Sequence, residues 1–194
     1  MTNAVFNEQP PSEIRTARLL VRAWQPGDAP MLKQVVDANL VHLQRWMPWA
    51  MHEPSPPEVV AERVTQFADA FSAGIEWLYG IFAPDGNDLL GGCGLHPRIG
   101  PSGLEMGYWL AAEQTGKGFA TEAAGALTGA ALALPGIDHT EIRCDPWNLA
   151  SAAVPRRLGY RLVEQLRHDA VTPAGAPRDT MVWRMTREDF DRRA

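Results

Sequence analysis

The chain has 194 residues, of which 45% are hydrophobic and 21% charged, a composition typical of a globular protein and not of a disordered or fibrous one. Its formal net charge is -5, from 18 Lys and Arg residues against 23 Asp and Glu residues, which argues against non-specific binding to nucleic acid. Cys93 and Cys144 are too few for a disulfide framework or a closed zinc site, and no apolar run approaches the roughly 18 residues that span a membrane. We therefore expect a soluble cytoplasmic protein without a metal site, a nucleic-acid partner or a membrane partner.

The sequence predicts an N-terminal arm that is followed by a single domain. Residues 1–15 are polar and contain adjacent prolines, so the domain is expected to occupy residues 16–194. A first strand is predicted over residues 18–23. Asp28 then has the position of a helix N-cap, with Pro30 in the first turn, where a missing N–H group costs little.

An irregular segment separates this first helix from a second one. Residues 39–57 combine a short helical pattern with several prolines and two tryptophans. Ser55 and Glu58 have the spacing of a capping box, in which the Ser oxygen and the Glu carboxylate each accept from a free backbone N–H group. Apolar residues then recur at helical spacing, which predicts a long helix that ends near Ser72.

The middle of the chain is predicted to form an antiparallel meander, with strands over residues 76–83, 89–96 and 104–110. Glycines in the second strand either weaken it or mark a close approach of another backbone. An alanine-rich helix is predicted over residues 119–134. The remaining predicted elements are a strand over 140–144, a helix over 150–158, and strands over 160–167 and 180–185. This order indicates a mixed α/β chain.

A glycine-containing loop, Gln114-Thr-Gly116-Lys-Gly118-Phe-Ala120, joins the last meander strand to the alanine-rich helix. Backbone N–H groups at a helix N-terminus lack intrahelical partners and attract anions, and Gly116 and Gly118 would let phosphate oxygens approach the backbone. The loop alone is equally compatible with a plain structural turn. It contains neither Gly-Lys-Ser/Thr nor Gly-x-Gly-x-x-Gly, which disfavours a nucleotide hydrolase or a dinucleotide enzyme.

Three segments together resemble the GNAT acetyltransferase superfamily and, within it, the RimJ/RimL-type N-acetyltransferases. The glycine loop is similar to the (Q/R)-x-x-G-x-(G/A) loop that binds the acyl-CoA pyrophosphate. Asn148-x-x-Ser151 followed by Arg157-Leu-Gly-Tyr160 is similar to the Asn-x-x-Ser and LGF element. Arg18-Leu-Leu-Val-Arg22 and Trp46-Met-Pro-Trp49 resemble the first strand and the substrate-side helix of that branch.

The resemblance implies a fold and a reaction. The fold would be a central mixed, mostly antiparallel sheet of six to seven strands, splayed in the middle, with about four helices on both faces. The reaction would move an acetyl group from acetyl-CoA to a primary amine by direct attack in a ternary complex, releasing CoA. The acceptor would be a protein N-terminal α-amine, as in ribosomal-protein-alanine N-acetyltransferases, or a small-molecule amine. A homodimer is an option in the same branch.

The resemblance also implies which residues bind acetyl-CoA. The backbone N–H groups of residues 116–120 would hold the pyrophosphate, Asn148 would contact the pantetheine arm, and the thioester would lie beside residues 106–110. The register of the loop motif stays open, because Gln114-x-x-Gly places the first family glycine on Lys117. The implied cofactor-binding set is Tyr108, Trp109, Leu110, Gln114, Thr115, Gly116, Lys117, Gly118, Phe119, Ala120, Thr121 and Asn148.

The reaction needs a base for the protonated amine and an acid for the leaving thiolate. Strand alternation places Glu105 on one face with Gly107 and Trp109, and a carboxylate on a central strand is costly unless it is wet, paired or working. Glu105 is therefore the candidate base, with an exposed rim carboxylate as the alternative. Tyr160 is the candidate acid, unless it packs as a phenylalanine would. Ser151 is a second catalytic candidate, although a simple helix N-cap explains it better.

Aromatic and histidine side chains suggest where the acceptor binds. Trp46 and Trp49 lie in the irregular segment and could wall a substrate cavity or form a lid on the sheet. His96 ends a strand next to Glu105 and could face the cleft, or be a hydrogen-bonded surface residue. Neither cysteine has the sequence context of a thiolate nucleophile, which disfavours a covalent acyl-enzyme. A non-catalytic acyl-CoA-binding module on the same fold is the alternative function.

Overall fold

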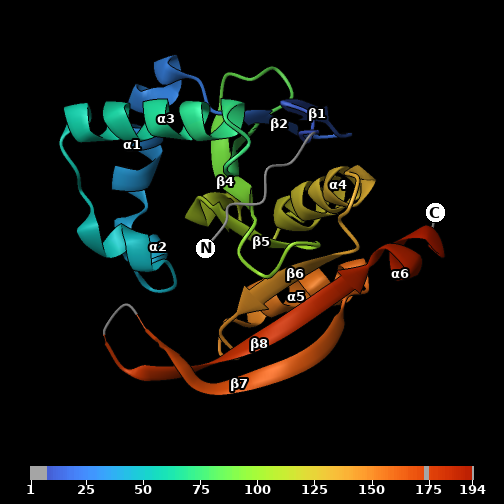
Figure 1. Cartoon of the computed structure of the whole chain (residues 1–194). Helices are drawn as coiled ribbons and strands as arrows, with labels where there is room; N and C mark the ends of the chain where they lie inside the picture. Colours follow the sequence, from blue (N-terminus) through green and yellow to red (C-terminus); the bar gives the residue numbers. More distant parts are fainter. Residues whose placement is uncertain (1–7, 173–174, 194) are drawn as a thin grey trace.

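The computed structural model describes residues 8–172 and 175–193, so the first seven residues of the predicted arm lie outside the described range. Within it, a single eight-stranded sheet has the order β1-β2-β3-β4-β5-β6-β8-β7, and helices cover both faces (Figure 1). The strands are β1 (Glu13–Arg15), β2 (Leu20–Ala23), β3 (Trp77–Phe82), β4 (Leu89–His96), β5 (Gly103–Leu110), β6 (His139–Cys144), β7 (Arg161–Val171) and β8 (Pro177–Thr186). The α-helices are α1 (Ala29–Ala38), α2 (Leu40–Gln44), α3 (Pro57–Ser72), α4 (Phe119–Ala133), α5 (Leu149–Leu158) and α6 (Arg187–Asp191). The 3-10 helices are η1 (Pro26–Asp28), η2 (Pro48–His52) and η3 (Ala112–Gln114).

The predicted mixed α/β fold is confirmed, with short elements that the sequence did not predict. β1 lies within the segment expected to be an arm and pairs antiparallel with β2, so that Glu13 lies opposite Arg22. α6 begins after Thr186, whose hydroxyl accepts a hydrogen bond from the Asp189 N–H group at 3.1 Å. Among the described residues the sheet therefore has eight strands instead of the expected six to seven, and there are six α-helices instead of about four.

The predicted splay in the sheet lies between β5 and β6. All neighbouring strands are antiparallel except this pair, which is parallel. β5 and β6 pair only from Gly103↔His139 to Met106↔Ile142, whereas β5 stays paired with β4 as far as Gly91↔Leu110. Beyond Met106 one edge of β5 therefore has no neighbouring strand among the described residues. We call this opening between the two strands the seam.

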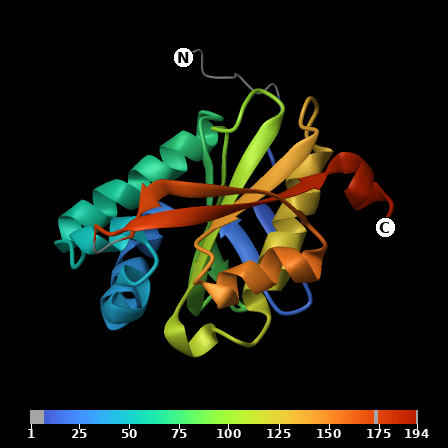
Figure 2. The same ribbon diagram turned by 90° about the horizontal axis from the view of Figure 1, so that it is seen from below.

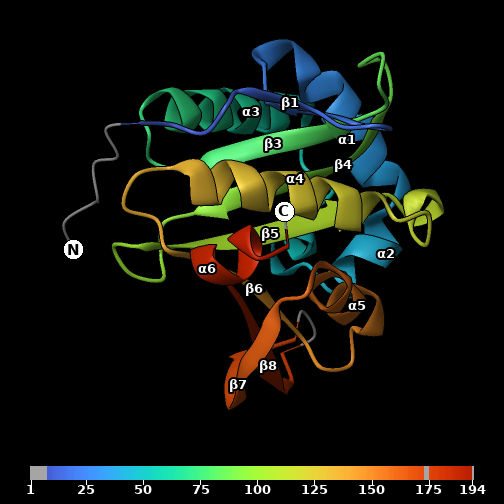
Figure 3. The same ribbon diagram turned by 90° about the vertical axis from the view of Figure 1, so that its right-hand side faces the viewer.

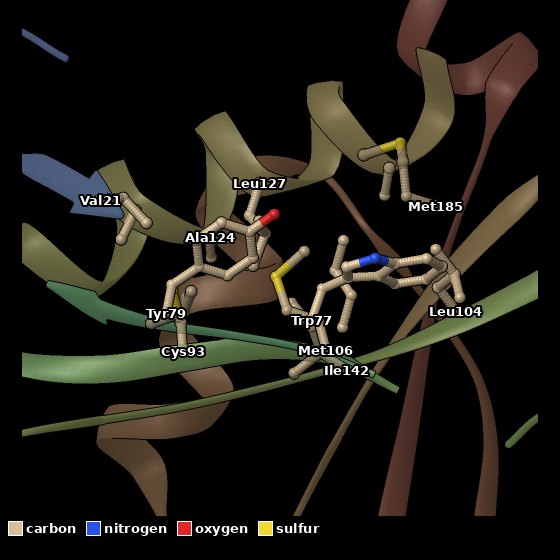
Figure 4. Packing of buried hydrophobic residues seen from close by; sticks show 14 of the residues in the cluster. Val21, Trp77, Tyr79, Cys93, Leu104, Met106, Ala124, Leu127, Ile142 and Met185 are labelled. Atoms are coloured by element: carbon tan, nitrogen blue, oxygen red, sulfur yellow. The ribbon is translucent and has the colours of Figure 1, made fainter. Parts of the chain in front are cut away.

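Two hydrophobic clusters fix the strands on either side of the seam. α4 lies across the sheet (Figure 3), and its Leu127 side chain belongs to the same buried cluster as Trp77 and Leu104 of the strands beneath (Figure 4). α1 and α3 contribute to the second cluster, where Leu20 and Phe82 point away from α4. Because burial of a large apolar side chain contributes roughly 1.5–3 kcal/mol, the two clusters make the central strands a stable platform.

Two predicted helix caps are wrong in detail. Asp28 does precede α1, but its carboxylate accepts from Arg22 at 2.7 Å and from the Gln25 N–H group at 2.8 Å instead of capping that helix. α3 begins at Pro57 with no side-chain cap, so the Ser55 capping box does not form. The Ser55 hydroxyl accepts from Arg63 at 3.1 Å instead. In both cases a nearby arginine takes the oxygen that the local pattern assigned to the helix.

No helix of the described residues is long and apolar enough to cross a bilayer.

The ion pair between Arg22 and Asp28 predicts a pH-dependent stability. Burial alone would raise the pKa of Asp28, but hydrogen bonds from Arg22 and from the Gln25 N–H group outweigh it and lower the pKa. A carboxyl group whose pKa is lower in the folded state stabilises that state above its unfolded pKa near 4, and this stabilisation is lost as the pH falls through the folded value. We expect Asp28→Asn to lower the free energy of unfolding by about 2 kcal/mol at pH 7.

Urea unfolding at several pH values checks this expectation. The difference between wild type and Asp28→Asn should be largest above about pH 5 and should shrink below about pH 4. Asp88→Asn makes the same change at an exposed turn residue and should leave stability nearly unchanged. A difference that stays constant down to acid pH would contradict the assigned role of the ion pair.

Candidate active site

A cavity of about 800 Å³ opens beside the seam. Its floor is the face of β4 and β5 that carries Glu105, and its far wall comes from the β7–β8 hairpin. This hairpin extends from the body of the sheet (Figure 1) and crosses in front of the other strands when the molecule is seen from below (Figure 2). Trp46 and Trp49 form the opposite wall, from the segment around η2. The cavity is also lined by His52, Arg63, His96, Arg98, Gly107, Tyr108, Trp109, Arg143, Cys144, Asp145, Asn148, Ser151, Asp169 and Arg178.

Glycines make the cavity floor flat enough for two rings to lie on it. A Cβ atom at Gly92 would come within 2.7 Å of the Trp109 indole nitrogen, so that ring lies against the backbone of β4. Cβ atoms at Gly94 and Gly107 would each lie 3.4 Å from the His96 Nε2 atom. The glycines that the sequence flagged in the second meander strand thus mark a close approach of side-chain rings. Trp109 in turn meets Trp49 edge-on, with ring centroids 5.9 Å apart.

His96 is oriented by a carboxylate. Its Nδ1 atom bonds to the carboxylate of Glu76, which precedes β3. The hydrogen bond from His96 outweighs partial burial and holds the pKa of Glu76 below its usual value, so the carboxylate accepts and Nδ1 carries the proton. The second ring nitrogen, Nε2, is then left with a lone pair above the cavity floor. The sequence offered His96 as a residue that could face the cleft, with a hydrogen-bonded surface residue as the alternative, but it did not predict the contact with Glu76.

Glu105 belongs to a row of paired charges that crosses three strands. Its Oε1 atom accepts from Arg98 at 2.5 Å, and its Oε2 atom lies 3.7 Å from the Arg143 guanidinium. Arg143 also pairs with Glu141 at 2.9 Å, and Arg184 of β8 pairs with the other oxygen of Glu141 at 2.5 Å. Burial would raise the pKa of Glu141, but the hydrogen bonds from Arg184 and Arg143 lower it further than burial raises it. The carboxylate of Glu105 is thus paired. Pairing is one of the three conditions, with solvation and a catalytic role, under which a carboxylate is expected on a central strand.

Tyr108 faces the seam together with the start of α5. Its hydroxyl donates to the Ser151 carbonyl at 3.1 Å and lies 3.3 Å from the Ser151 hydroxyl. Burial raises the pKa of Tyr108, so the phenol stays protonated at neutral pH. Asn148 is the N-cap of α5, because its side-chain oxygen accepts from the Ser151 N–H group at 3.1 Å. Ser151 therefore lies within the first turn of α5 and is not the cap that its position suggested.

Tyr160 is a core residue and lies outside the cavity. Its hydroxyl is 2.7 Å from the Thr128 hydroxyl and 2.8 Å from the Thr140 hydroxyl, and it is 5% exposed. Burial raises its pKa, and the two threonines only partly offset that effect. The geometry favours the packing alternative for Tyr160, and of the two tyrosines only Tyr108 faces the seam.

The glycine loop forms an amide-lined turn at the N-terminus of α4. Gly116 and Gly118 have φ angles of 75° and 84°, in the left-handed region that favours glycine, and Gly118 is the N-cap. No group of the described residues accepts a recorded hydrogen bond from the N–H groups of residues 116–121. These groups include those of Phe119, Ala120 and Thr121 in the first turn of α4. The loop lies beyond Leu110, the buried last residue of β5, and does not line the cavity itself.

Side chains of the loop and of a distant turn hold this conformation. The Arg18 guanidinium donates to the Lys117 carbonyl at 3.0 Å, pairs with Glu122 at 2.6 Å and lies 4.9 Å from the centre of the Phe119 ring. Lys117 bonds to the Gln114 side chain at 2.9 Å, and Thr115 donates to the Ala112 carbonyl at 2.7 Å. The polar side chains of the loop are engaged within it, which leaves backbone amides as the groups that can bind an anion.

Several residues of the site were not found from the sequence. Arg143 and Glu141 reach Glu105 because the strand order places β6 beside β5, whereas Glu76 and Arg98 come from the segments just before β3 and just after β4. Alternation within each strand gives the face of a side chain, but the partner across the sheet depends on the register between strands distant in sequence. Once the register is known, Glu105 lies opposite His96 on one side and Glu141 on the other.

Comparison with known proteins assigns the fold to a family. Residues 18–161 match the acetyltransferase (GNAT) domain, so the chain belongs to this family. A Bacillus subtilis (strain 168) protein named "Putative ribosomal N-acetyltransferase YdaF" is 27% identical over 180 residues, which cover 89% of this chain and 93% of that protein.

Two solved structures show the same fold over nearly the whole chain. The ribosomal L7/L12 alpha-N-protein acetyltransferase RimL in complex with coenzyme A is 24% identical, with a TM-score of 0.81 and coverage of 94% of this chain and 99% of that one. The microcin C7 self-immunity acetyltransferase MccE in complex with acetyl-CoA and AMP is 19% identical, with a TM-score of 0.82 and coverage of 91% and 97%.

Because Gly118 caps α4 in the left-handed conformation, we expect one added methyl group at this position to lower the stability of the fold. Gly118→Ala should lower the free energy of unfolding by about 1 kcal/mol, because an L-residue is disfavoured at positive φ. Gly27→Ala is the matched control, since Gly27 has no positive φ and a Cβ atom there would meet nothing within 4 Å. Urea unfolding of both variants measures the difference, and equal effects would show that the loop does not need its left-handed residue.

Proposed function

We propose that this chain is an acetyl-CoA-dependent N-acetyltransferase whose acceptor is the N-terminal amine of a protein. One observation carries the proposal: the seam between β5 and β6 has an amide-lined helix N-terminus at one end and a cavity with proton-transfer groups at the other. Family membership supports acetyl transfer to an amine. The burial of both thiols favours direct attack in a ternary complex, since burial raises the pKa of Cys93 to about 12 and also raises the pKa of Cys144, which disfavours a thiolate nucleophile.

The loop residues fit the diphosphate of CoA. Unpartnered N–H groups from Gly116 to Thr121 converge where the helix dipole of α4 is positive, and two positive-φ glycines keep side chains away from the anion. Arg18 and Glu122 neutralise each other and hold the loop from outside. In this proposal the diphosphate binds through backbone amides, while Gln114, Thr115 and Lys117 fix the shape of the turn.

The free edge of β5 fits an extended arm. Backbone groups of Gly107 to Leu110 on the side of β6 have no strand partner among the described residues, so an amide-bearing chain can pair with them as an added strand. Asn148 and Ser151 border the same opening. Acetyl-CoA supplies a thioester, and pairing along β5 would place it at the cavity floor beside Tyr108.

The cavity residues can carry the proton transfers that amide formation requires. Glu105 and His96 both lie on the floor, where the acceptor amine would lose its proton, and they are the two candidates for the base. Tyr108 is the proposed acid for the leaving thiolate, because its raised pKa keeps the phenol protonated and the Ser151 carbonyl orients its hydroxyl. A backbone N–H group of β5 at the seam can stabilise the oxyanion.

The acceptor assignment rests on the names of the relatives and on the shape of the cavity. The relatives include proteins named as ribosomal N-acetyltransferases. Trp46, Trp49 and the β7–β8 hairpin leave the cavity open to solvent between them, which suits a chain terminus. The small-molecule amine is the second candidate, since MccE is named as a self-immunity acetyltransferase. The non-catalytic module is not favoured, because it would need no proton-transfer groups at the seam.

A thiol-release assay tests the proposal. With acetyl-CoA, the chain should release CoA in the presence of peptides that begin with a free serine or alanine amine. The same peptides with an acetylated N-terminus should give no release, and free amino acids and polyamines should be poorer acceptors. CoA should bind at least 10-fold more tightly than pantetheine, which lacks the diphosphate, because charge-assisted hydrogen bonds to the loop contribute more than 1.4 kcal/mol. Binding of CoA without turnover of any amine would support the non-catalytic module instead.

Two tyrosine variants separate the candidate acids. Tyr108→Phe should lower kcat by about 100-fold with little change in CoA affinity, because only the proton donor is lost. Tyr160→Phe removes a hydroxyl from the Thr128–Thr140 contact and should cost about 1 kcal/mol of stability while kcat stays within about 2-fold. Steady-state kinetics of the two purified variants decides between them, and the reverse pattern would make Tyr160 the acid.

A further inference from the structure

We propose that His96, oriented by Glu76, is the base that takes the proton from the acceptor amine, and that Glu105 is held in the ion-pair row and does not accept that proton. The inference rests on the proposed acetyl transfer and names the proton acceptor of that reaction. It assigns His96 a catalytic role, whereas the sequence suggested only a place in the acceptor pocket. Glu76 becomes a positioning residue, because it acts through the imidazole.

The first argument is the orientation of the imidazole. Glu76 engages Nδ1, so the neutral ring carries its proton there and presents the Nε2 lone pair. Cβ atoms built at Gly94 and Gly107 would lie 3.4 Å from Nε2, which places this nitrogen over the bare backbone of β4 and β5. The side chain is 16% exposed, so the ring is sheltered but reachable from the cavity. No described residue has a recorded hydrogen bond with Nε2.

The second argument concerns the competing carboxylate. Each oxygen of Glu105 faces a guanidinium group, Arg98 at 2.5 Å and Arg143 at 3.7 Å. A base must offer a lone pair to the substrate, and Oε1 is already used by the shorter of these contacts. Since Arg143 is also shared with the buried Glu141, displacing Glu105 would disturb the whole row. The arrangement holds Glu105 as a fixed charge.

Other charged groups lie around the imidazole. Its charged neighbours are Glu105 on β5, Glu76 just before β3 and Arg98 just after β4. Further groups line the cavity from other elements: His52, Arg63, Arg143, Asp145, Asp169 and Arg178. Carboxylates and guanidiniums are both present around the ring. Glu76 is the charged group in direct contact with it, so its removal should have the largest effect on the titration.

The proton count of the reaction is consistent with this assignment. The ammonium form of the acceptor gives one proton to His96 Nε2, and the neutral amine nitrogen then bonds to the thioester carbon. The carbon–sulfur bond breaks, the sulfur takes the electron pair, and a proton from Tyr108 converts the thiolate to a thiol. The nitrogen loses its second proton as the amide forms, which restores Tyr108, and the proton on His96 passes to water. Glu76 balances the transient imidazolium charge.

The test is the pH dependence of kcat/KM for wild type and four variants. For His96→Gln we expect kcat/KM to fall 100-fold or more at pH 7. The decline of kcat/KM at low pH that comes from protonation of the imidazole, the acid limb, should be absent. Glu76→Gln removes the anion beside the ring, so the acid limb should move to lower pH with a smaller loss on its plateau. Glu105→Gln should keep the acid limb, whatever its effect on the rate. His139→Gln is the matched control, because His139 pairs with Asp138 in the same way but lies outside the cavity, and it should behave as wild type.

CoA titration of each variant separates misfolding from a chemical defect, since a folded variant should keep the wild-type affinity. Restoration of His96→Ala activity by added imidazole would further support a base at this position. The inference is overturned if His96→Gln keeps the wild-type rate and acid limb, or if Glu105→Gln alone removes that limb. Failure of the wild-type chain to acetylate any amine would instead overturn the proposed function, so the two failures can be told apart.

Discussion

The interrupted pairing between β5 and β6 is the constraint on which the rest of the structure depends. A parallel pair that stops after Met106 and Ile142 leaves half of a central strand with a free edge, which a stable sheet normally avoids. The two hydrophobic clusters and the antiparallel pairing with β4 hold β5 in the sheet despite this loss. The free edge is thus a stable feature of the fold, and its unpaired backbone groups are available to an added extended chain.

In the proposed function, the groups that would bind the cofactor and the groups that would transfer protons lie in different parts of the seam. In this proposal, backbone amides at the start of α4 would supply an anion site without a committed side chain, while glycines on β4 and β5 let His96 and Trp109 lie on the cavity floor. The charged residues Glu105, Arg143 and Glu141 link β5 to β6 on this face through side chains. We infer that this row fixes the width of the seam close to the point where the strands separate.

The sequence predicted the elements that local patterns determine, and it was wrong where distant residues decide. The meander and the alanine-rich helix followed from spacing and turn chemistry, whereas the left-handed N-cap at Gly118 was not predicted. The capping box at Ser55 does not form, because Arg63 takes the hydroxyl. The role of Tyr160 stays a prediction, and its hydroxyl faces Thr128 and Thr140 in the core. The partner of His96 could not be predicted, because Glu76 reaches it across an antiparallel pair whose register no local pattern gives.

Amide hydrogen exchange with and without CoA tests the central claim most directly. The account predicts that bound CoA slows exchange of N–H groups in two separate places, residues 107–110 on the free edge of β5 and residues 116–121 at the start of α4, while β2 and β3 are unaffected. Protection of both segments would show that one ligand spans the seam from the loop to the cavity. Unchanged exchange along β5 at saturating CoA would contradict it, whatever the affinity.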